Sequence, residues 1–188
     1  MSRIRFIFLA AVFILFGCEK KITDEQFEQN VFAQIFLNVV DSTYKDQRLY
    51  TSFPEPEKDR YAHNGKLTKR DSKIETLKND TLSLIIAVGN RGLINEKTDL
   101  QNYNTRKFIF KHLSELPRNM EFENWTAKYS KFAGTMFFSN IRFDAGKRHG
   151  TLDVSYYCGS RCGLGYVVTI KEINDKWVIS KVKNTWIS

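Results

Sequence analysis

The last third of the chain alternates between apolar and polar residues, and this pattern constrains the fold more than any other feature. Apolar residues occupy every second position from Leu152 to Tyr156 and again from Tyr166 to Ile170. A period of two residues is typical of β-strands that bury one face. Because turn residues at 144–150 and 174–175 separate the apolar segments, we predict an antiparallel meander. Its four strands are predicted at Thr135–Phe143, around Leu152–Tyr156, around Tyr166–Ile170 and at Lys176–Val182.

Large apolar residues also mark the strands that precede this region. Within the first meander strand, Phe137, Ile141 and Phe143 are separated by even numbers of positions, so we expect them to share one side of the strand. Upstream, the apolar segment Leu82–Val88 predicts a buried strand. The segment Lys107–Leu113 predicts another strand, with a short helix as the alternative.

The segment that begins at Thr23 carries the signals of a long amphipathic helix. Thr23–Gln26 fits a capping box, in which the first and fourth side chains each accept a hydrogen bond from the other's backbone. Apolar residues then recur at helical spacing as far as Tyr44, so we predict a helix over Asp24–Lys45. Its apolar stripe is expected to pack on the sheet, and a partner-binding face is the alternative.

The segment Phe53–Lys73, with two prolines and many charges, predicts a long exposed loop.

Together these elements predict the α+β class, with a long N-terminal helix packed on a curved antiparallel sheet that ends in the four-stranded meander. About 170 residues follow position 17, which suits a single domain over residues 24–188. The order of helix first and meander last is similar to that of cystatin-like and nuclear-transport-factor-2-like cones. This resemblance concerns the fold and implies no activity.

The N-terminus has the charge and the apolar pattern of an export signal. Arg3 and Arg5 open an otherwise apolar stretch that extends to Phe16. A bilayer-spanning helix needs about 20 apolar residues, so this shorter stretch suits the apolar part of a signal peptide. We therefore predict a signal peptide over residues 1–17.

The end of this stretch, Leu15-Phe16-Gly17-Cys18, resembles the lipobox of bacterial lipoproteins. The resemblance implies cleavage before Cys18, lipidation of Cys18 with palmitate among the fatty acids, and a tether over residues 18–23. Two or more acyl chains hold a protein firmly on a membrane. The implied localisation is the bacterial cell envelope, with the outer membrane favoured over the inner one and the domain exposed to the periplasm or the cell surface.

Cys158 and Cys162 lie in the connection between two meander strands, among the glycines at 159, 163 and 165. Outside the cytoplasm a disulfide persists, and three intervening residues allow the two Cα atoms to come within bridging range. We favour a structural disulfide over a redox pair or a zinc site, since a structural zinc needs four ligands. The glycines are expected to supply positive φ for a tight turn. Arg161 would then point to solvent as a candidate contact residue for a ligand or partner.

Three short motifs end the chain: Cys-Gly-x-x-Cys-Gly at 158–163, Lys-Trp at 176–177 and Trp-Ile-Ser at 186–188. In these motifs the C-terminal part is similar to the ends of uncharacterised secreted proteins and lipoproteins. The resemblance implies a shared domain type and no catalytic role.

The charge balance is basic. The chain has 29 Lys and Arg residues against 21 Asp and Glu, and without residues 1–17 the balance is 27 against 21. We interpret the moderately basic surface as one that keeps the protein soluble. The alternative interpretation is that this surface binds an anionic partner. Lys66, Lys69 and Arg70 are the candidate contacts for such a partner. Nucleic acid is not expected, because the sequence has no nucleic-acid-binding motif and export places it elsewhere.

The sequence contains no hydrolase, zinc-protease or phosphate-loop motif, so we predict no catalytic residues, no metal ligands and no cofactor. The favoured function is a membrane-anchored, non-catalytic binding or structural module with an envelope protein or a glycan as partner. Two alternatives stay open. One is an enzyme with a dispersed site in a cone-like cavity, and the other is a thiol-redox lipoprotein that uses Cys158 and Cys162.

Overall fold

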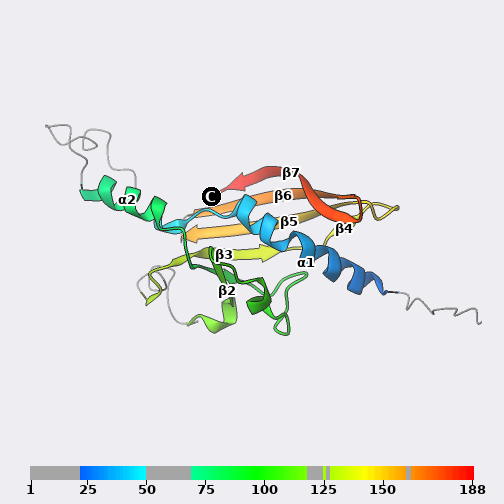
Figure 1. Ribbon diagram of the computed structural model, residues 1–188, viewed down its shortest axis with the longest axis horizontal. Coiled ribbons are helices and arrows are strands. Elements are labelled where there is room, and N and C mark those ends of the chain that lie inside the picture. Colours follow the sequence, from blue (N-terminus) through cyan, green and yellow to red (C-terminus); the bar gives the residue numbers. More distant parts are fainter. Residues whose placement is uncertain (1–21, 50–68, 118–124, 126–127, 160–161) are drawn as a thin grey trace, which may run out of the picture.

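A computed structural model describes residues 22–49, 69–117, 125, 128–159 and 162–188, and these residues form a mixed α+β architecture (Figure 1). The described helices are α1 (Asp24–Thr43), α2 (Lys69–Asn79) and the short 3-10 helices η1 (Gln47–Leu49), η3 (Leu100–Tyr103) and η4 (Leu113–Glu115). The strands are β1 (Leu84–Val88), β2 (Phe108–His112), β3 (Phe132–Phe138), β4 (Arg142–Phe143), β5 (His149–Gly159), β6 (Cys162–Ile173) and β7 (Lys176–Ile187). In the described part of the chain these strands form one open seven-stranded sheet, so the α+β class is confirmed.

The sheet is mixed, which corrects the prediction of an antiparallel sheet. Its strand order is β2-β1-β3-β5-β6-β7, and β4 pairs with β5. Strand β1 is parallel to both β2 and β3, whereas the other pairs are antiparallel. Parallel neighbours need a connection of a dozen or more residues, and the chain from β1 to β2 (89–107) and from β1 to β3 (89–131) is long enough. The apolar pattern of a strand carries no direction, so it did not reveal this arrangement.

The C-terminal meander is confirmed as β3, β5, β6 and β7. The strand predicted at Thr135–Phe143 is nevertheless divided into β3 and β4. The ladder with β5 stops at Ser139, whose hydroxyl accepts a hydrogen bond from the backbone N–H of Asp153 at 2.9 Å. The chain then turns before it pairs with β5 again.

This interruption corrects the predicted orientation of Phe137. Ile141 and Phe143 pack in or against the core under α1. Phe137 lies on the other side of the sheet, and Phe138 takes the core position, with its ring centroid 5.4 Å from that of Phe32 on α1. An even spacing predicts a shared side only where the strand is continuous.

Helix α1 lies across one face of the sheet (Figure 1). The predicted capping box is present, because Thr23 and Gln26 each donate a backbone N–H to the other's side-chain oxygen at 3.1 Å. The helix ends at Thr43, two residues before the predicted end, since Tyr44 has extended backbone angles (φ −69°, ψ 152°). Its buried apolar stripe consists of Val31, Phe32, Ile35, Phe36, Val39 and Val40.

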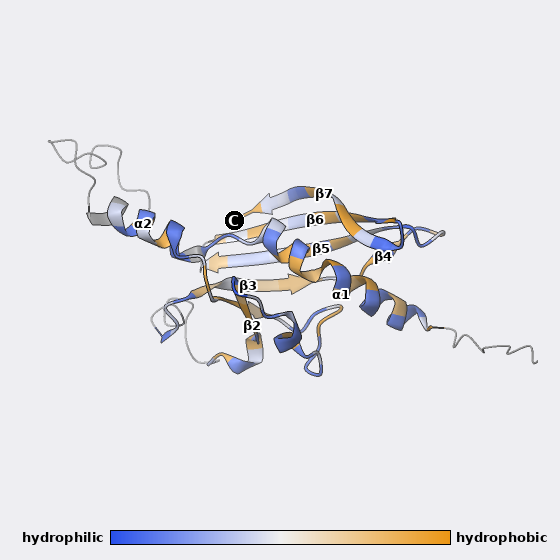
Figure 2. Ribbon diagram, in the orientation of Figure 1, coloured by the Kyte–Doolittle hydropathy of each residue, from blue (hydrophilic) through white to orange (hydrophobic). Residues whose placement is uncertain are grey.

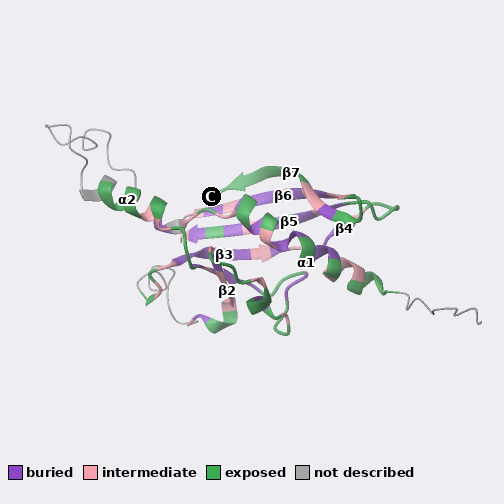
Figure 3. Cartoon of the chain, in the orientation of Figure 1, coloured by how far each residue is buried: buried purple, intermediate pink, exposed green. Residues whose placement is uncertain are grey.

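Helix α2 occupies residues that we predicted to end an exposed loop. The loop prediction is wrong for residues 69–73, and residues 53–68 lie outside the described part of the chain. The sequence 69–79 contains neither Gly nor Pro, and a Glu75–Lys78 ion pair of 2.6 Å spans one turn. Figures 1 and 3 show α2 extending beyond the sheet with largely exposed sides.

The two faces of the sheet are covered differently. On the face opposite α1, Ala87, Leu116 and Phe132 form a second small core that covers β1 and β3, and Ile85, Leu113, Trp125 and Tyr129 pack against it. Over β5, β6 and β7 most side chains of this face are partly or fully exposed, as Figure 3 shows for β7. Figure 2 shows the same contrast, since β3 is apolar along its length and β7 includes hydrophilic stretches. We call the uncovered part over β5, β6 and β7, together with the adjoining side chains of β3, the open face.

Candidate functional site

A pocket of about 550 Å³ lies where the open face meets the second small core. Strands β3 and β5 contribute to it, together with the chain after β1 and residues near η4. It combines aromatic and aliphatic surface with amide and guanidinium groups, as ligand pockets commonly do. The lining residues are Asn90, Arg91, Leu113, Trp125, Thr135, Phe137, Tyr157 and Gly159.

Two aromatic side chains from adjacent strands meet in this pocket. The register pairs Thr135 with Tyr157 and Phe137 with Ser155, which places all four residues on the same face. The ring centroids of Phe137 and Tyr157 are 5.8 Å apart at an interplanar angle of 87°, an edge-to-face contact. Beside them the indole N–H of Trp125 donates to a backbone carbonyl at 3.0 Å, which fixes the orientation of that ring.

A third aromatic side chain of the open face, Trp186 on β7, lies flat over strand β6. A Cβ atom added to Gly165 would come within 1.9 Å of the Trp186 Nε1 atom. One added to Gly163 would come within 2.9 Å of Cζ3, at the other end of the indole. Both rings of the indole therefore rest on the backbone of β6, and the 38 % of Trp186 that is exposed belongs largely to its outer surface.

The glycines near the cysteines do not have the role that we predicted. Positive φ angles occur at Gly92 and Gly134, and not at Gly159, Gly163 or Gly165. Gly163 and Gly165 instead lie within the β6 ladder, where the absence of a side chain makes room for the indole.

Phe137, Tyr157 and Trp186 form a continuous series, which we call the aromatic row. The centroids of Tyr157 and Trp186 are 6.0 Å apart at an interplanar angle of 48°. Tyr157 is 37 % exposed, so the row presents aromatic surface to solvent beyond the pocket. One end of the row lies in the pocket, and the other end crosses β6 to the edge strand β7.

Positive charge lies on the same face of the sheet as the aromatic row. The β6 and β7 registers place Lys171, Lys181 and Lys183 on the open face. Among the described residues of β3, β5, β6 and β7, this face carries one carboxylate, that of Asp153, which pairs with Arg142 at 2.8 Å. The lysine charges therefore exceed the acidic charge of these strands on the open face.

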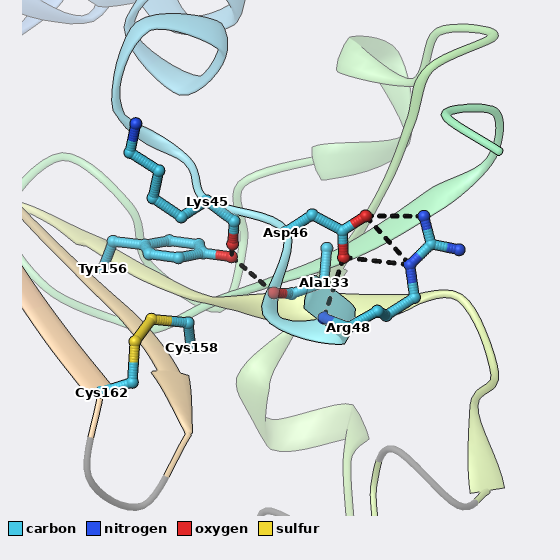
Figure 4. Close-up of a disulfide and its surroundings, with 7 residues drawn as sticks. All are labelled: Lys45, Asp46, Arg48, Ala133, Tyr156, Cys158 and Cys162. Carbon is cyan, nitrogen blue, oxygen red and sulfur yellow. Dashed lines mark hydrogen bonds and ion pairs between the residues drawn. A yellow bond between two sulfur atoms is a disulfide. The ribbon is translucent and has the colours of Figure 1, made fainter. Parts of the chain in front are cut away.

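Cys158 and Cys162 lie at disulfide distance, with their Cα atoms 5.1 Å apart (Figure 4). This agrees with the predicted pairing, although the strands extend further than we expected. Strand β5 continues to Gly159 and β6 begins at Cys162, so the two cysteines lie at the end of the ladder and not in a long connection. Arg161 lies outside the described residues.

The buried Tyr156 lies next to the disulfide and reaches toward the chain that follows α1 (Figure 4). Its hydroxyl contacts the backbone carbonyl oxygens of Lys45 and Ala133. Gly134 allows this approach, because a Cβ atom there would lie 2.5 Å from the Tyr156 hydroxyl oxygen. The tyrosine therefore ties the end of α1 to the sheet directly behind the open face.

A network of ion pairs lies next to Tyr156 (Figure 4). The buried guanidinium of Arg48 binds the carboxylate of Asp46 at 2.6 Å and that of Asp80 at 3.1 Å, and Asp80 also pairs with Lys131. Burial opposes the charge of Arg48, but the hydrogen bonds that its guanidinium donates to both carboxylates outweigh it and raise the pKa of Arg48. The hydrogen bond from Lys131 lowers the pKa of Asp80. These contacts join η1 to the sheet and leave Arg48 engaged within the protein.

A second cavity, of about 600 Å³, adjoins the N-terminus of α1. Three of the four carboxylates that line it have partners within the protein. Asp24 pairs with Lys147 at 2.6 Å, Glu28 accepts a backbone N–H, and Asp144 contacts His149 Nδ1 at 3.0 Å. The hydrogen bond from Lys147 lowers the pKa of Asp24. These contacts connect α1 to the β4–β5 turn.

Among the predicted site residues, the two cysteines adjoin the aromatic row, and the candidate contact residues do not contribute to it. Cys18 and Lys66 lie outside the described residues, as does the segment predicted as a signal peptide. Lys69 and Arg70 begin α2, and the positions of their side chains are not described. The pocket and the aromatic row were not predicted from the sequence.

Within the described ranges, no group of three or more His, Cys, Asp and Glu residues is placed to hold a metal ion. In the same part of the chain, no helix is both long and apolar enough to cross a membrane. No known protein family, curated protein or solved structure matches this chain.

Proposed function

We propose that this chain is a lipid-anchored, non-catalytic binding module of the bacterial cell envelope, and that its ligand binds on the open face. The aromatic row is the observation that carries the binding part of this proposal. The lipobox-like stretch that ends at Cys18 carries the part that concerns the anchor.

The aromatic row supports binding because aromatic surface is costly to leave in water. Tyr157 and Trp186 remain more than one-third exposed, although both could be covered by a longer connection or a second helix. Contiguous exposed apolar surface that is bordered by polar groups commonly marks a binding site for a ligand or a partner. The row also leads into a pocket where Asn90 and Arg91 supply hydrogen-bond donors, which suits a ligand that has both apolar and polar parts.

The sequence before α1 supports a position close to a membrane. Helix α1 begins at Asp24, so the tether from Cys18 has six residues. Six extended residues span at most about 20 Å, which keeps the folded part near the lipid surface. A module held there would meet ligands that belong to the envelope.

Metabolic labelling with radioactive palmitate tests the anchor. In bacteria that express the full chain, we expect label on the wild type and on a Cys158→Ala/Cys162→Ala variant, and none on Cys18→Ala. We also expect the first two proteins in the membrane fraction. Absence of label from all three, or label that persists without Cys18, would refute the proposed anchoring.

A further inference from the structure

We infer that the ligand of the open face is an acidic glycan, a chain of sugar rings that carry carboxylate groups. This rests on the proposed function, because an envelope location makes a glycan a more plausible ligand than a nucleic acid. The inference draws on the shape of the aromatic row, on its length and on the charge beside it.

The orientation of Trp186 gives a flat binding surface. The indole covers Gly163 and Gly165 with one side, and the opposite side faces outward. A pyranose ring has an apolar side formed by C–H groups and hydroxyl groups around its edge. It can therefore stack on an exposed indole while its hydroxyls remain in water or bind neighbouring polar groups.

The length of the aromatic row suits a chain of rings more than one compact molecule. Its three rings follow one another at centroid distances of 5.8 and 6.0 Å, across the strands from β3 to β7. At the pocket end, Arg91 and Asn90 belong to the same lining. A guanidinium forms paired hydrogen bonds with a carboxylate, which a uronic-acid residue in the pocket would supply.

The charge of the open face favours an acidic glycan over a neutral one. The β7 lysines Lys181 and Lys183 share this face with Trp186, and Lys171 lies on the adjacent β6. Lys183 pairs with Val167 of β6, and Trp186 pairs with Gly165 of the same strand. Val167 and Gly165 are two residues apart, which corresponds to about 7 Å along the strand. Asp153 is neutralised by Arg142, so these lysines would attract carboxylates in a salt-dependent manner.

Calorimetric titration of the full-length protein in neutral detergent tests the inference. The acidic probe is oligogalacturonate, and the neutral probe is a maltooligosaccharide of the same length. We expect the acidic probe to bind more tightly at low salt and to lose most of this advantage in 0.5 M sodium chloride, at about three times the salt of physiological solutions. We expect Trp186→Ala to weaken the binding of the acidic probe by about tenfold.

Two matched variants separate the binding surface from general damage. Ile187→Ala removes an exposed apolar side chain from the other face of β7 and should leave binding unchanged. Lys181→Ala/Lys183→Ala should weaken the binding of the acidic probe and make its affinity depend less on salt. Lys78→Ala on α2 should have neither effect. Trp186→Phe keeps an aromatic ring and should restore part of the affinity, which a merely unfolded protein would not show.

Several results would overturn the inference. They are no binding of oligogalacturonate at low salt, equal binding by Trp186→Ala, and equal affinity for the neutral probe. The same holds if single-stranded oligothymidylate, or vesicles of phosphatidylglycerol, bind through Trp186 while the glycan does not. Palmitate labelling of each variant keeps the two proposals apart, because loss of label contradicts the anchor whereas loss of glycan binding with intact label contradicts only the ligand.

Discussion

Substitution of Gly165 by alanine tests whether the indole of Trp186 rests on strand β6. The added methyl group would lie 1.9 Å from Nε1 and 2.3 Å from Cδ1 of the indole, far inside van der Waals contact. The neighbouring backbone belongs to a ladder paired on both sides, so the side chain is the part that can move. We therefore expect Gly165→Ala to push the indole of Trp186 away from the sheet.

The expected loss of stability follows from the surface that this movement uncovers. More than half of Trp186 is covered in the folded protein. If about 80 Å² of apolar surface is uncovered, the cost is about 2 kcal/mol at about 25 cal/mol per Å². Replacing a glycine in a strand with alanine restores about 0.5–1 kcal/mol, because the unfolded chain loses freedom. The net effect should be a loss of about 1 kcal/mol, or about 3 °C in the melting temperature.

A double-mutant cycle in urea denaturation, followed by circular dichroism of the full-length protein, gives the measurement. Without the indole the added methyl group meets no obstacle from Trp186, so Gly165→Ala should raise the free energy of unfolding by about 0.5–1 kcal/mol in a Trp186→Ala background. The control is Gly146→Ala, since a Cβ there has no atom within 4 Å, so this variant should raise the free energy of unfolding by about 0.4–1 kcal/mol whether or not Trp186 is present. If Gly165→Ala has the same effect in both backgrounds, the indole does not rest on β6 and the argument for a flat binding surface is wrong.

Three further substitutions or treatments have expected outcomes. Tyr156→Phe should lower the free energy of unfolding in urea by about 1–2 kcal/mol, because the single O–H that the two backbone carbonyl oxygens share is lost. Reduction of the Cys158–Cys162 bond should cost up to about 2 kcal/mol in the same assay and leave the far-ultraviolet circular dichroism unchanged, since a five-residue ring restrains the unfolded chain only modestly. Lys131 holds the pKa of Asp80 below its ordinary 3.8, so ionised Asp80 stabilises the fold above that pH and the contribution is lost as the pH falls through the folded-state pKa. In a series of unfolding measurements from neutral pH downward, Asp80→Asn should therefore lose less stability than the wild type.

Local patterns explain the parts of the fold that the sequence predicted. The capping box at Thr23–Gln26 and the helical spacing after it involve neighbours within a few residues, and α1 begins where they indicate. The alternation in β5 and β6 likewise depends on one strand at a time, and the turn residues between the strands favour antiparallel pairing. The parallel pairing of β1 with β2 and β3 depends on where two connections of about 20 residues lead, and no local pattern encodes that path.

The aromatic row escaped prediction for a related reason. Gly165 and Trp186 are 21 positions apart, and their contact exists only in the register that pairs them. Taken alone, glycines after a cysteine suggested a turn, since turns are where glycine is most often required. A usable signal was nevertheless present. Gly163 and Gly165 occupy alternate positions, hence one face of a strand, and Trp186 follows four residues after the strand predicted at Lys176–Val182.

The disulfide and the aromatic row both depend on how β5 pairs with β6 near the cysteines. Cys158 is buried on the α1 side, while the adjacent Tyr157 points to the open face. The pairing of Gly159 with Cys162 closes the β5–β6 ladder, and the next pair, after a register shift, joins Tyr157 to Gly163. Because the cysteines hold that end of the ladder closed, they limit how far Tyr157 can shift relative to the indole above Gly163. A bond that contributes little to global stability would thus contribute mainly to the spacing of the aromatic row, and reduction should weaken ligand binding more than its effect on unfolding suggests.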